Sequence, residues 1–100
     1  MTFESDPQVL RVTGLTELNA SNAAAFRDQA RAALQPNHTR LDLDFAQLRF
    51  LDSSGLGALL SLHKILRTQG GILKLLNPSA AVTQLIELTR LHRVFEIVHA

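Results

Sequence analysis

Hydrophobic positions along this 100-residue chain recur with two spacings, and these spacings divide it into strands and helices. Apolar and polar residues alternate over residues 40–45, which predicts a strand with one buried face. A β-branched run predicts a second strand at 9–12, and a nearly continuous apolar run at 72–76 predicts a strand covered on both faces. Residues 94–98 predict a last strand, and Phe3 indicates an edge strand at the N-terminus.

Apolar residues three and four positions apart predict three helices. These helices span residues 23–34, 54–69 and 79–88. Gly70 follows the second helix, where a glycine in the left-handed conformation commonly closes the last turn. The third helix is expected to bury four apolar residues: Val82, Leu85, Ile86 and Leu88.

The predicted order of elements is β-(β)-α-β-α-β-α-β. This alternation favours an α/β fold, in which helices pack on a mixed four- to five-stranded sheet with right-handed crossovers. The length suits one domain, and an apolar content of 46% is enough for one core. No repeat, low-complexity segment or linker interrupts the chain, so we expect a single domain over residues 1–100.

Composition narrows the classes of function. The net charge is only +1 and the aromatic residues are all Phe, which argues against a nucleic-acid partner. Cysteine is absent and the four histidines lack the spacing of metal ligands, so we expect no metal and no cofactor. The chain shows neither a signal peptide nor an apolar run of about 18 residues, so we expect a cytoplasmic protein with no direct membrane insertion.

The segment with the clearest chemistry reads Leu-Asp-Ser-Ser-Gly-Leu-Gly at residues 51–57, between a predicted strand and a predicted helix. Such a corner exposes a serine where the free N–H groups of the helix can receive a negative charge. Gly55 and Gly57 indicate a close approach to the backbone, because glycine in a helix costs about 0.5–1 kcal/mol relative to alanine. We therefore interpret this corner as a candidate phosphorylation switch.

The sequence raises two further points about the corner: the position of Asp44 and the alternative role of Ser53. Asp44 ends the preceding strand, and we expect it at the same edge of the sheet as Asp52 and Ser53. The alternative to a switch is that Ser53 merely caps the helix while the two glycines pack against the sheet.

Enzymatic interpretations are disfavoured. Asp42 and Asp44 have the Asp-x-Asp spacing of phosphotransferases with an aspartyl nucleophile, but the following residues do not continue that motif. A serine hydrolase needs Gly-x-Ser-x-Gly around its nucleophile, whereas Leu51 stands two residues before Ser53. His63 is about 15 Å farther along the helix, so it cannot act as a base for that serine. We expect no enzyme activity.

The long second helix carries two apolar lines. One line is expected to face the sheet and contains Leu56, Leu59, Leu60, His63 and Leu66. The other contains Ala58, Leu62 and Ile65, and it continues toward Ser53 through Ser61. Either a neighbouring helix covers this second line, or it forms an exposed patch for a partner protein. We favour the partner-binding patch because it shares a helix with the candidate switch.

Several segments together match one known family. They are Leu-Asp at 43–44, Phe-Leu-Asp-Ser-Ser-Gly-Leu-Gly at 50–57, Gly-Gly at 70–71, Asn-Pro-Ser at 77–79 and Leu-His-Arg-Val-Phe-Glu-Ile at 91–97. With these segments, residues 41–98 resemble the STAS domain of bacterial anti-sigma factor antagonists. In that family the serine directly after the aspartate is phosphorylated. The resemblance implies that Ser53 is the phosphoacceptor, and that its surroundings comprise Asp44, Asp52, Ser54, Gly55 and Gly57.

The resemblance also implies partners. When Ser53 is unphosphorylated, the protein is expected to bind an anti-sigma factor serine kinase with a histidine-kinase-like ATPase fold, which frees the sigma factor. Phosphorylation is expected to release the kinase, and a PPM-type phosphatase resets the switch. Related STAS domains occur in membrane transport complexes. The alternative function is therefore a constitutive interaction subunit, for example of a lipid-transport ABC ATPase.

Two positions depart from the family pattern. The family usually has Gly-Glu-Leu-Asp after the second strand, whereas residues 14–19 read Gly-Leu-Thr-Glu-Leu-Asn, with two additional residues and Asn19 in place of aspartate. The family often has glycine after the third helix, where this chain has Arg90. A left-handed turn would strain Arg90, so we expect the helix to end differently.

Overall fold

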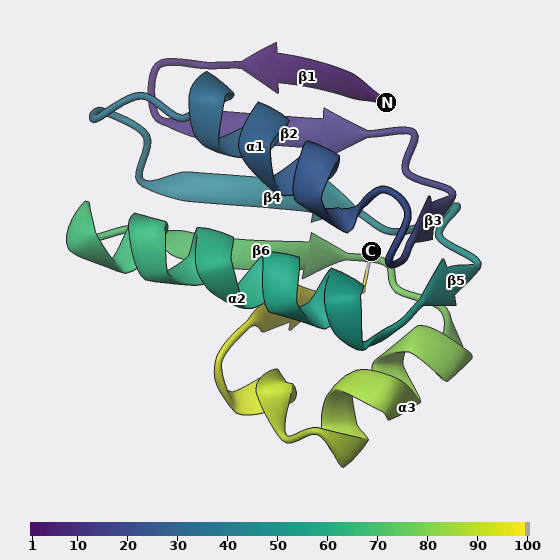
Figure 1. Ribbon diagram of the computed structural model, residues 1–100. Coiled ribbons are helices and arrows are strands. Elements are labelled where there is room, and N and C mark those ends of the chain that lie inside the picture. Colours follow the sequence, from purple (N-terminus) through teal and green to yellow (C-terminus); the bar gives the residue numbers. More distant parts are fainter. Residues whose placement is uncertain (100) are drawn as a thin grey trace.

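A mixed five-stranded sheet forms the centre of the computed structural model, which describes residues 1–99 (Figure 1). Its strands are β1 (Thr2–Ser5), β2 (Val9–Thr13), β4 (Arg40–Asp44), β6 (Ile72–Leu76) and β7 (Glu96–Val98). They lie in the order β1-β2-β4-β6-β7, with β1 antiparallel to β2 and every other pair parallel. The α/β fold and the edge strand at Phe3 are therefore confirmed.

Three α-helices and one 3-10 turn complete the fold. They are α1 (Ala23–Ala33), α2 (Ser53–Thr68), α3 (Ala80–Leu88) and the 3-10 turn η1 (Leu91–Arg93). Helices α1 and α2 lie side by side across one face of the sheet, and α3 lies near β5 (Figure 1). The three predicted helices are confirmed, with ends that differ by one residue.

A separate two-stranded ribbon was not predicted. Strand β3 (Glu17–Leu18) pairs in parallel with β5 (Phe50–Leu51), which places Leu18 opposite Leu51. Both leucines are buried. A strand of two residues shows no measurable alternation, so the sequence pattern could not reveal it. The ribbon ties the loop after β2 to the segment that leads into α2.

The core fills the space between the sheet and the helices. Leucines and a valine of the three central strands alternate into it, and they meet apolar side chains of α1 and α2. The fully or almost fully buried members include Leu10, Val12, Leu41, Leu43, Leu73 and Leu75 from the sheet, and Phe26, Ala30, Leu59 and Leu66 from the helices.

The sheet is covered on one face only, so the prediction of two covered faces for residues 72–76 is wrong. Leu73 and Leu75 are buried, whereas Ile72 is 38% exposed and Leu76 is only half-buried. The third helix shows a similar difference. It buries Val82 and Ile86 as predicted, but Leu88 at its last position is 74% exposed.

The two chain reversals that follow α2 and α3 both use left-handed residues. Gly70 has a φ of 70° directly after α2, as predicted. Arg90 has a φ of 62° after α3, so the expectation that this helix would end differently is wrong. The backbone therefore accepts at Arg90 a conformation that favours glycine, and the chain continues directly into η1.

A row of charged residues crosses the uncovered face of the sheet. The strand register places these five residues side by side, one from each strand: Glu4, Arg11, Asp42, Lys74 and Glu96. Their signs alternate along the whole row. The central carboxylate of Asp42 is 3% exposed and accepts hydrogen bonds from Arg40 Nε (2.8 Å) and Nη2 (3.1 Å). Arg11 lies 3.6 Å away on the other side, so neighbouring charges compensate one another.

Replacing the central charge tests how much this row contributes. We expect Asp42→Ala to lower the free energy of unfolding by about 2–3 kcal/mol, because two guanidinium groups lose a buried acceptor. Glu96→Ala is the matched control and should cost less than about 1 kcal/mol, since its carboxylate is 44% exposed in its pair with Lys74. Urea denaturation measures both values, and equal losses would contradict a central role for Asp42.

Candidate functional site

Asp52 joins the start of α2 to the loop before α1. It is the N-cap residue of α2, and its Oδ1 accepts a hydrogen bond from the Gly55 N–H at 3.0 Å. Its Oδ2 accepts a second hydrogen bond, from the Ala20 N–H at 3.1 Å. Its own N–H donates to the Leu18 carbonyl at 3.2 Å. One residue therefore fixes the helix start against two other segments.

Ser53 and Ser54 are the first two residues of α2, and both are exposed. The alternative in which Ser53 caps the helix is wrong, because Asp52 occupies the capping position. Helix geometry leaves the N–H groups of Ser53 and Ser54 without acceptors inside the helix. Within residues 1–99, no side chain bonds to the Ser53 hydroxyl. The corner thus presents a free hydroxyl beside free N–H groups.

The two glycines of the corner have different surroundings. A Cβ atom on Gly55 would lie 2.6 Å from the Leu18 carbonyl oxygen and 2.6 Å from Leu51 Cδ1. Gly55 therefore packs against the β3–β5 ribbon, as the structural alternative expected, so its missing side chain is explained inside the molecule. A Cβ atom on Gly57 would meet nothing within 4 Å. Gly57 is exposed, so no contact inside the described chain requires a glycine there.

The loop that carries Ala20 is ordered by its own side chains. Asn19 Oδ1 accepts hydrogen bonds from the Ser21 N–H (2.9 Å) and hydroxyl (2.6 Å). Asn22 Oδ1 accepts one from the Asn19 N–H (2.8 Å), and its amide donates to the Glu17 carbonyl (2.9 Å). Asn19, where the family pattern has aspartate, is thus part of the network that presents the Ala20 N–H.

Asp44 is held by its own turn. Its half-buried carboxylate accepts a hydrogen bond from the Ala46 N–H at 3.0 Å, just after β4. The described residues contain no hydrogen bond or ion pair that links Asp44 to Asp52 or Ser53. Its place in the surroundings of the phosphosite stays a prediction.

The second apolar line of α2 faces α1. Ala58 is 6% exposed and Leu62 is fully buried, because α1 packs alongside α2 and covers them. The expectation of an exposed partner-binding patch is wrong for these two residues. Ser61 and Ile65 are half-buried at the margin of the same line. The alternative of a covering neighbour helix is therefore confirmed for the centre of the line.

A different line of α2 faces solvent. It contains Ser53, Gly57, Leu60, Lys64 and Arg67, which are spaced four and three residues apart and share one side of the helix. We call this line the α2 seam. Leu60 is half-buried and the other four are exposed. The sequence pattern missed the seam because it assigned Leu60 to the line that faces the sheet.

His63 borders the seam on the side of η1. Its ring stands edge-on to Phe95, with 6.0 Å between the ring centroids. Its Nδ1 atom is buried without a hydrogen-bond partner in the described chain. Burial, and to a lesser extent the neighbouring charge of Arg67, lower the pKa of His63 below its usual value.

Two hollows lie near the segment that leads into α2. A groove of about 400 Å³ runs between α1 and α2, and its lining includes Ala24, Arg27, Ser54 and Gly57. A larger hollow of about 600 Å³ is formed by the loops around Thr16, residues 46–49 and Ser79. The larger hollow contains no residue of the 51–57 motif. Of these two hollows, the groove is the one that includes residues of the motif, Ser54 and Gly57.

The comparison with families decides the identity of the fold. The profile of the family described as "Mlab, STAS domain" matches residues 1–99. The chain belongs to the STAS domain family. Among residues 1–99 of this STAS domain, no helix is long and apolar enough to cross a lipid bilayer, and no three His, Asp or Glu side chains are placed to hold a metal ion.

Relatives of this STAS domain carry the name that the sequence resemblance implied. The chain is 28% identical over 90 residues to "Anti-sigma F factor antagonist" of Paenibacillus polymyxa, covering 89% of this chain and 75% of that protein. It is similar to the structure of the anti-sigma factor antagonist SpoIIAA in its unphosphorylated form, with a TM-score of 0.80 and 27% identity over 99% of this chain and 86% of the other. The Bacillus cell fate determinant SpoIIAA in the phosphorylated form gives a TM-score of 0.71 and 27% identity, over 99% and 89% of the two chains.

The cap at Asp52 is the first feature of the STAS domain to test. Asp52→Ala is expected to lower the free energy of unfolding by about 2 kcal/mol, because it removes a helix cap and a second hydrogen bond to Ala20. Ser79→Ala removes the cap of α3, where Ser79 Oγ accepts from the Val82 N–H only, and should cost about 1 kcal/mol. Thermal and urea denaturation compare the two variants. A larger loss for Ser79→Ala would contradict the double role of Asp52.

The lowered pKa of His63 predicts a pH dependence. In the unfolded chain, His63 takes up a proton near pH 6.5, whereas in the folded chain its lowered pKa disfavours the protonated form. The folded state should therefore lose stability as the pH falls below 6.5. His63→Leu, which cannot titrate, should lose less stability than the unmodified chain between pH 7.5 and pH 5.5. Urea denaturation at the two pH values provides the comparison, and identical pH dependences would show that His63 does not contribute.

Proposed function

We propose that this STAS domain is an anti-sigma factor antagonist whose binding to a serine kinase partner is controlled by phosphorylation of Ser53. One observation carries the proposal: Ser53 is exposed at the first position of α2, directly after the residue that caps the helix. The names of the relatives support it, since they are an anti-sigma factor antagonist and a protein known in unphosphorylated and phosphorylated forms.

The surroundings of Ser53 fit a phosphoacceptor rather than a catalyst. In phosphoryl transfer, Ser53 Oγ bonds to the γ-phosphorus of ATP, the bond from that phosphorus to the leaving ADP breaks, and the hydroxyl proton passes to a base. No side chain in residues 1–99 bonds to Ser53 Oγ, and His63 lies about 15 Å along the helix. The kinase partner therefore supplies the base, and this chain supplies the hydroxyl.

Phosphate on Ser53 changes charge more than shape. It adds about −1.5 to −2 charges at pH 7, and the N-terminus of α2 attracts that charge. The Asp52 carboxylate repels it, but both of its oxygens already accept backbone hydrogen bonds that fix the corner. The fold can therefore accept the phosphate without rearrangement, and the new charge acts on the docked partner.

The groove beside Ser53 provides the docking surface. Gly57 leaves open space above α2, and the side chains of α1 form the opposite wall of the groove. Ser53 precedes Ser54, which lines this groove, so a partner that reaches Ser53 with ATP meets the edge of the groove, and a phosphate on Ser53 lies at the border of that contact. Leu62 is not part of that surface because it is fully buried, whereas Ala58, which is 6% exposed, lines the groove.

An acidic substitution tests the switch. Ser53→Asp should weaken binding to the cognate histidine-kinase-like ATPase at least about tenfold, because it places a negative charge inside the contact. Its melting temperature should stay close to that of the unmodified chain. The affinity is measured by calorimetry with candidate ATPases from the same genome.

Ser53→Ala is the control for this experiment. It should bind the kinase, and mass spectrometry should find no phosphate on it after incubation with kinase and ATP. Phosphate on Ser54 alone, or equal affinities of the Ser53→Asp variant and the unmodified chain, would refute the proposed switch.

A further inference from the structure

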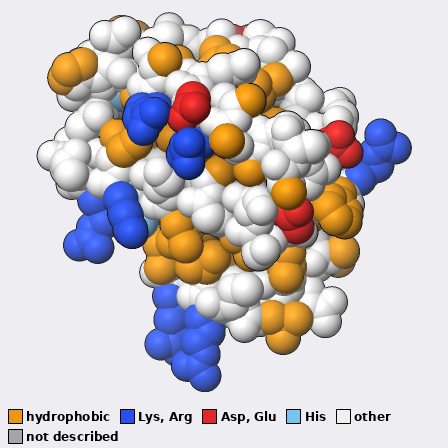
Figure 2. Space-filling model, viewed as in Figure 1, with side chains coloured by type: hydrophobic (Ala, Val, Ile, Leu, Met, Phe, Trp, Pro, Cys, Tyr) orange, Lys and Arg blue, Asp and Glu red, His pale blue; other side chains and the backbone are white. Residues whose placement is uncertain are grey.

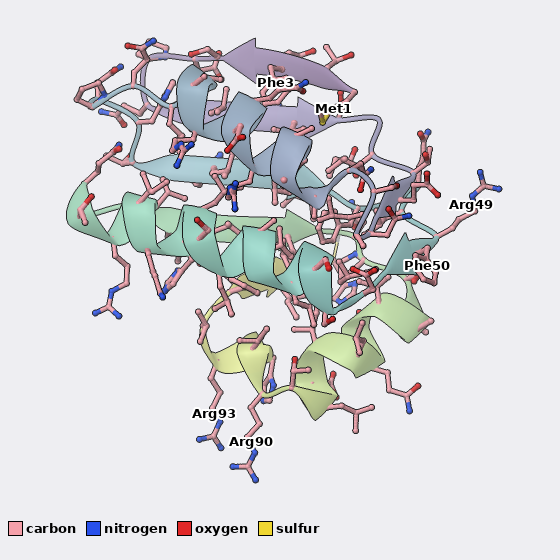
Figure 3. All side chains as sticks on the ribbon, in the orientation of Figure 1. Met1, Phe3, Arg49, Phe50, Arg90 and Arg93 are labelled. Atoms are coloured by element: carbon pink, nitrogen blue, oxygen red, sulfur yellow. The ribbon has the colours of Figure 1, made fainter. Side chains whose placement is uncertain are left out.

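The α2 seam leads from Ser53 into a strongly basic surface. Four exposed cationic residues form it: Lys64 and Arg67 at the C-terminal end of α2, and Arg90 and Arg93 around η1. We call these four residues the basic surface. Arg90 and Arg93 extend away from η1 into solvent (Figure 3). Figure 2 shows basic side chains in two groups on the lower part of this face of the molecule.

These cations lack the partners that most others in the chain have. Arg11 and Arg40 pair with Asp42, Arg27 and Arg31 pair with Asp28, and Lys74 pairs with Glu96. Over residues 1–99 the unpaired side-chain cations are the four of the basic surface and Arg49, which extends from the loop before β5 at the right of the view, away from Arg90 and Arg93 (Figure 3). A chain with a net charge of +1 thus concentrates its uncompensated positive charge on one surface.

Apolar side chains lie within the basic surface. Leu60, Leu91 and Val94 pack against the core with part of each side chain still accessible. Figure 2 shows hydrophobic side chains between the two basic groups. His63 lies beside Leu60 and stays neutral near pH 7, because burial and the charge of Arg67 lower its pKa. An apolar centre with a charged rim is the usual composition of a protein–protein contact.

The basic surface is too far from Ser53 to neutralise a phosphate on it. Lys64 is eleven residues beyond Ser53, or about 16 Å along the helix axis, and Arg67 is farther still. The Debye length is about 8–10 Å at moderate ionic strength, so these cations neutralise little of a phosphate on Ser53. The like charges also repel one another, which costs stability rather than adding to it. The helix dipole favours Arg67 in the last turn of α2, but it does not account for Arg90 and Arg93, and the phosphosite accounts for none of the four cations.

We propose that the basic surface binds an acidic segment of the kinase partner, with an apolar residue of that segment placed against Leu60, Leu91 and Val94. The inference rests on the proposed function, because the α2 seam continues from Ser53 into this surface without interruption. Four cations around an apolar centre, with no exposed Phe side chain among them, match an amphipathic acidic segment better than a nucleic acid. The partner is therefore held at two points, one near Ser53 and one at the far end of α2.

A defined peptide tests this surface without the kinase. The probe is a synthetic 16-residue amphipathic peptide that carries glutamates on one side and leucines on the other, titrated into the ¹⁵N-labelled full chain. Amide shifts are expected at Leu60, Lys64, Arg67 and residues 90–94, and not at Ser53. The same peptide with lysine in place of glutamate should produce none of them.

Charge reversal identifies the contributing residues. Lys64→Glu, Arg67→Glu, Arg90→Glu and Arg93→Glu should each weaken peptide binding about three- to tenfold, and the effect should shrink at high salt. Arg31→Glu is the matched control, because Arg31 is an exposed cation of α1 whose charge is compensated by Asp28, and it should leave binding unchanged. Ser53→Asp should also leave it unchanged. The two proposals can therefore fail separately. Absence of phosphate on Ser53 refutes the proposed function, whereas the peptide titration tests the basic surface by itself.

Two results would overturn the inference. One is a set of amide shifts that is absent, or that spreads over the paired cations of α1 and the sheet. The other is binding of the unmodified chain to phosphatidylglycerol vesicles that the same four reversals abolish, combined with no response to the acidic peptide. That second result would assign the basic surface to a lipid headgroup instead of a protein.

Discussion

The carboxylate of Asp52 is the constraint on which this site depends. It holds the first turn of α2 through Gly55 and the loop before α1 through Ala20, so one helix start and one loop share a single anchor. The β3–β5 ribbon adds a second anchor by placing the Leu18 carbonyl against Gly55, where no side chain would fit. Ser53 is the next residue along the chain. Its hydroxyl is therefore presented from a segment fixed by hydrogen bonds, although no side chain in residues 1–99 bonds to the hydroxyl itself.

In this arrangement, the groups that hold the helix start in place differ from the hydroxyl that is open to a partner. The neighbouring residues have their hydrogen-bonding groups engaged inside the molecule, whereas the two serines at the helix start have theirs open. A partner can thus approach the hydroxyl without breaking the contacts that hold it.

Much of the fold was predictable because its strands and helices are amphipathic. The alternation at 40–45 and the helical spacing of the three long helices each identified a buried face. The hydrophobic pattern gave wrong predictions where it does not specify which neighbouring element covers an apolar residue. A continuous apolar run such as 72–76 does not reveal how many faces are covered, and Leu88 looks apolar whether or not anything covers it. The ribbon at Leu18 and Leu51 depends on a pairing between segments more than 30 residues apart, which no local period records.

The candidate site was predictable in part. Asp52 and Ser53 were found through a family motif, and their geometry followed from the helix start. The error at Ala58 and Leu62 has a physical reason, since a helix with apolar residues on two sides does not specify which side its neighbour covers. The α2 seam was missed because Leu60 is apolar yet lies at the margin of the core. The basic surface combines Arg67 with Arg90, which only the folded chain brings onto one face.

The charged row across the open face of the sheet limits how the molecule assembles. Its alternating signs cancel over short distances, so from farther away that face presents almost no field. At contact, a partner would have to strip water from charged side chains, four of which are already paired with a neighbour: Arg11, Asp42, Lys74 and Glu96. A second copy gains little by stacking there. Productive contacts are left to the helical face, where α2 offers a single seam. On the proposed function, a partner bound along this seam covers Ser53 and leaves no second seam on α2 for another partner.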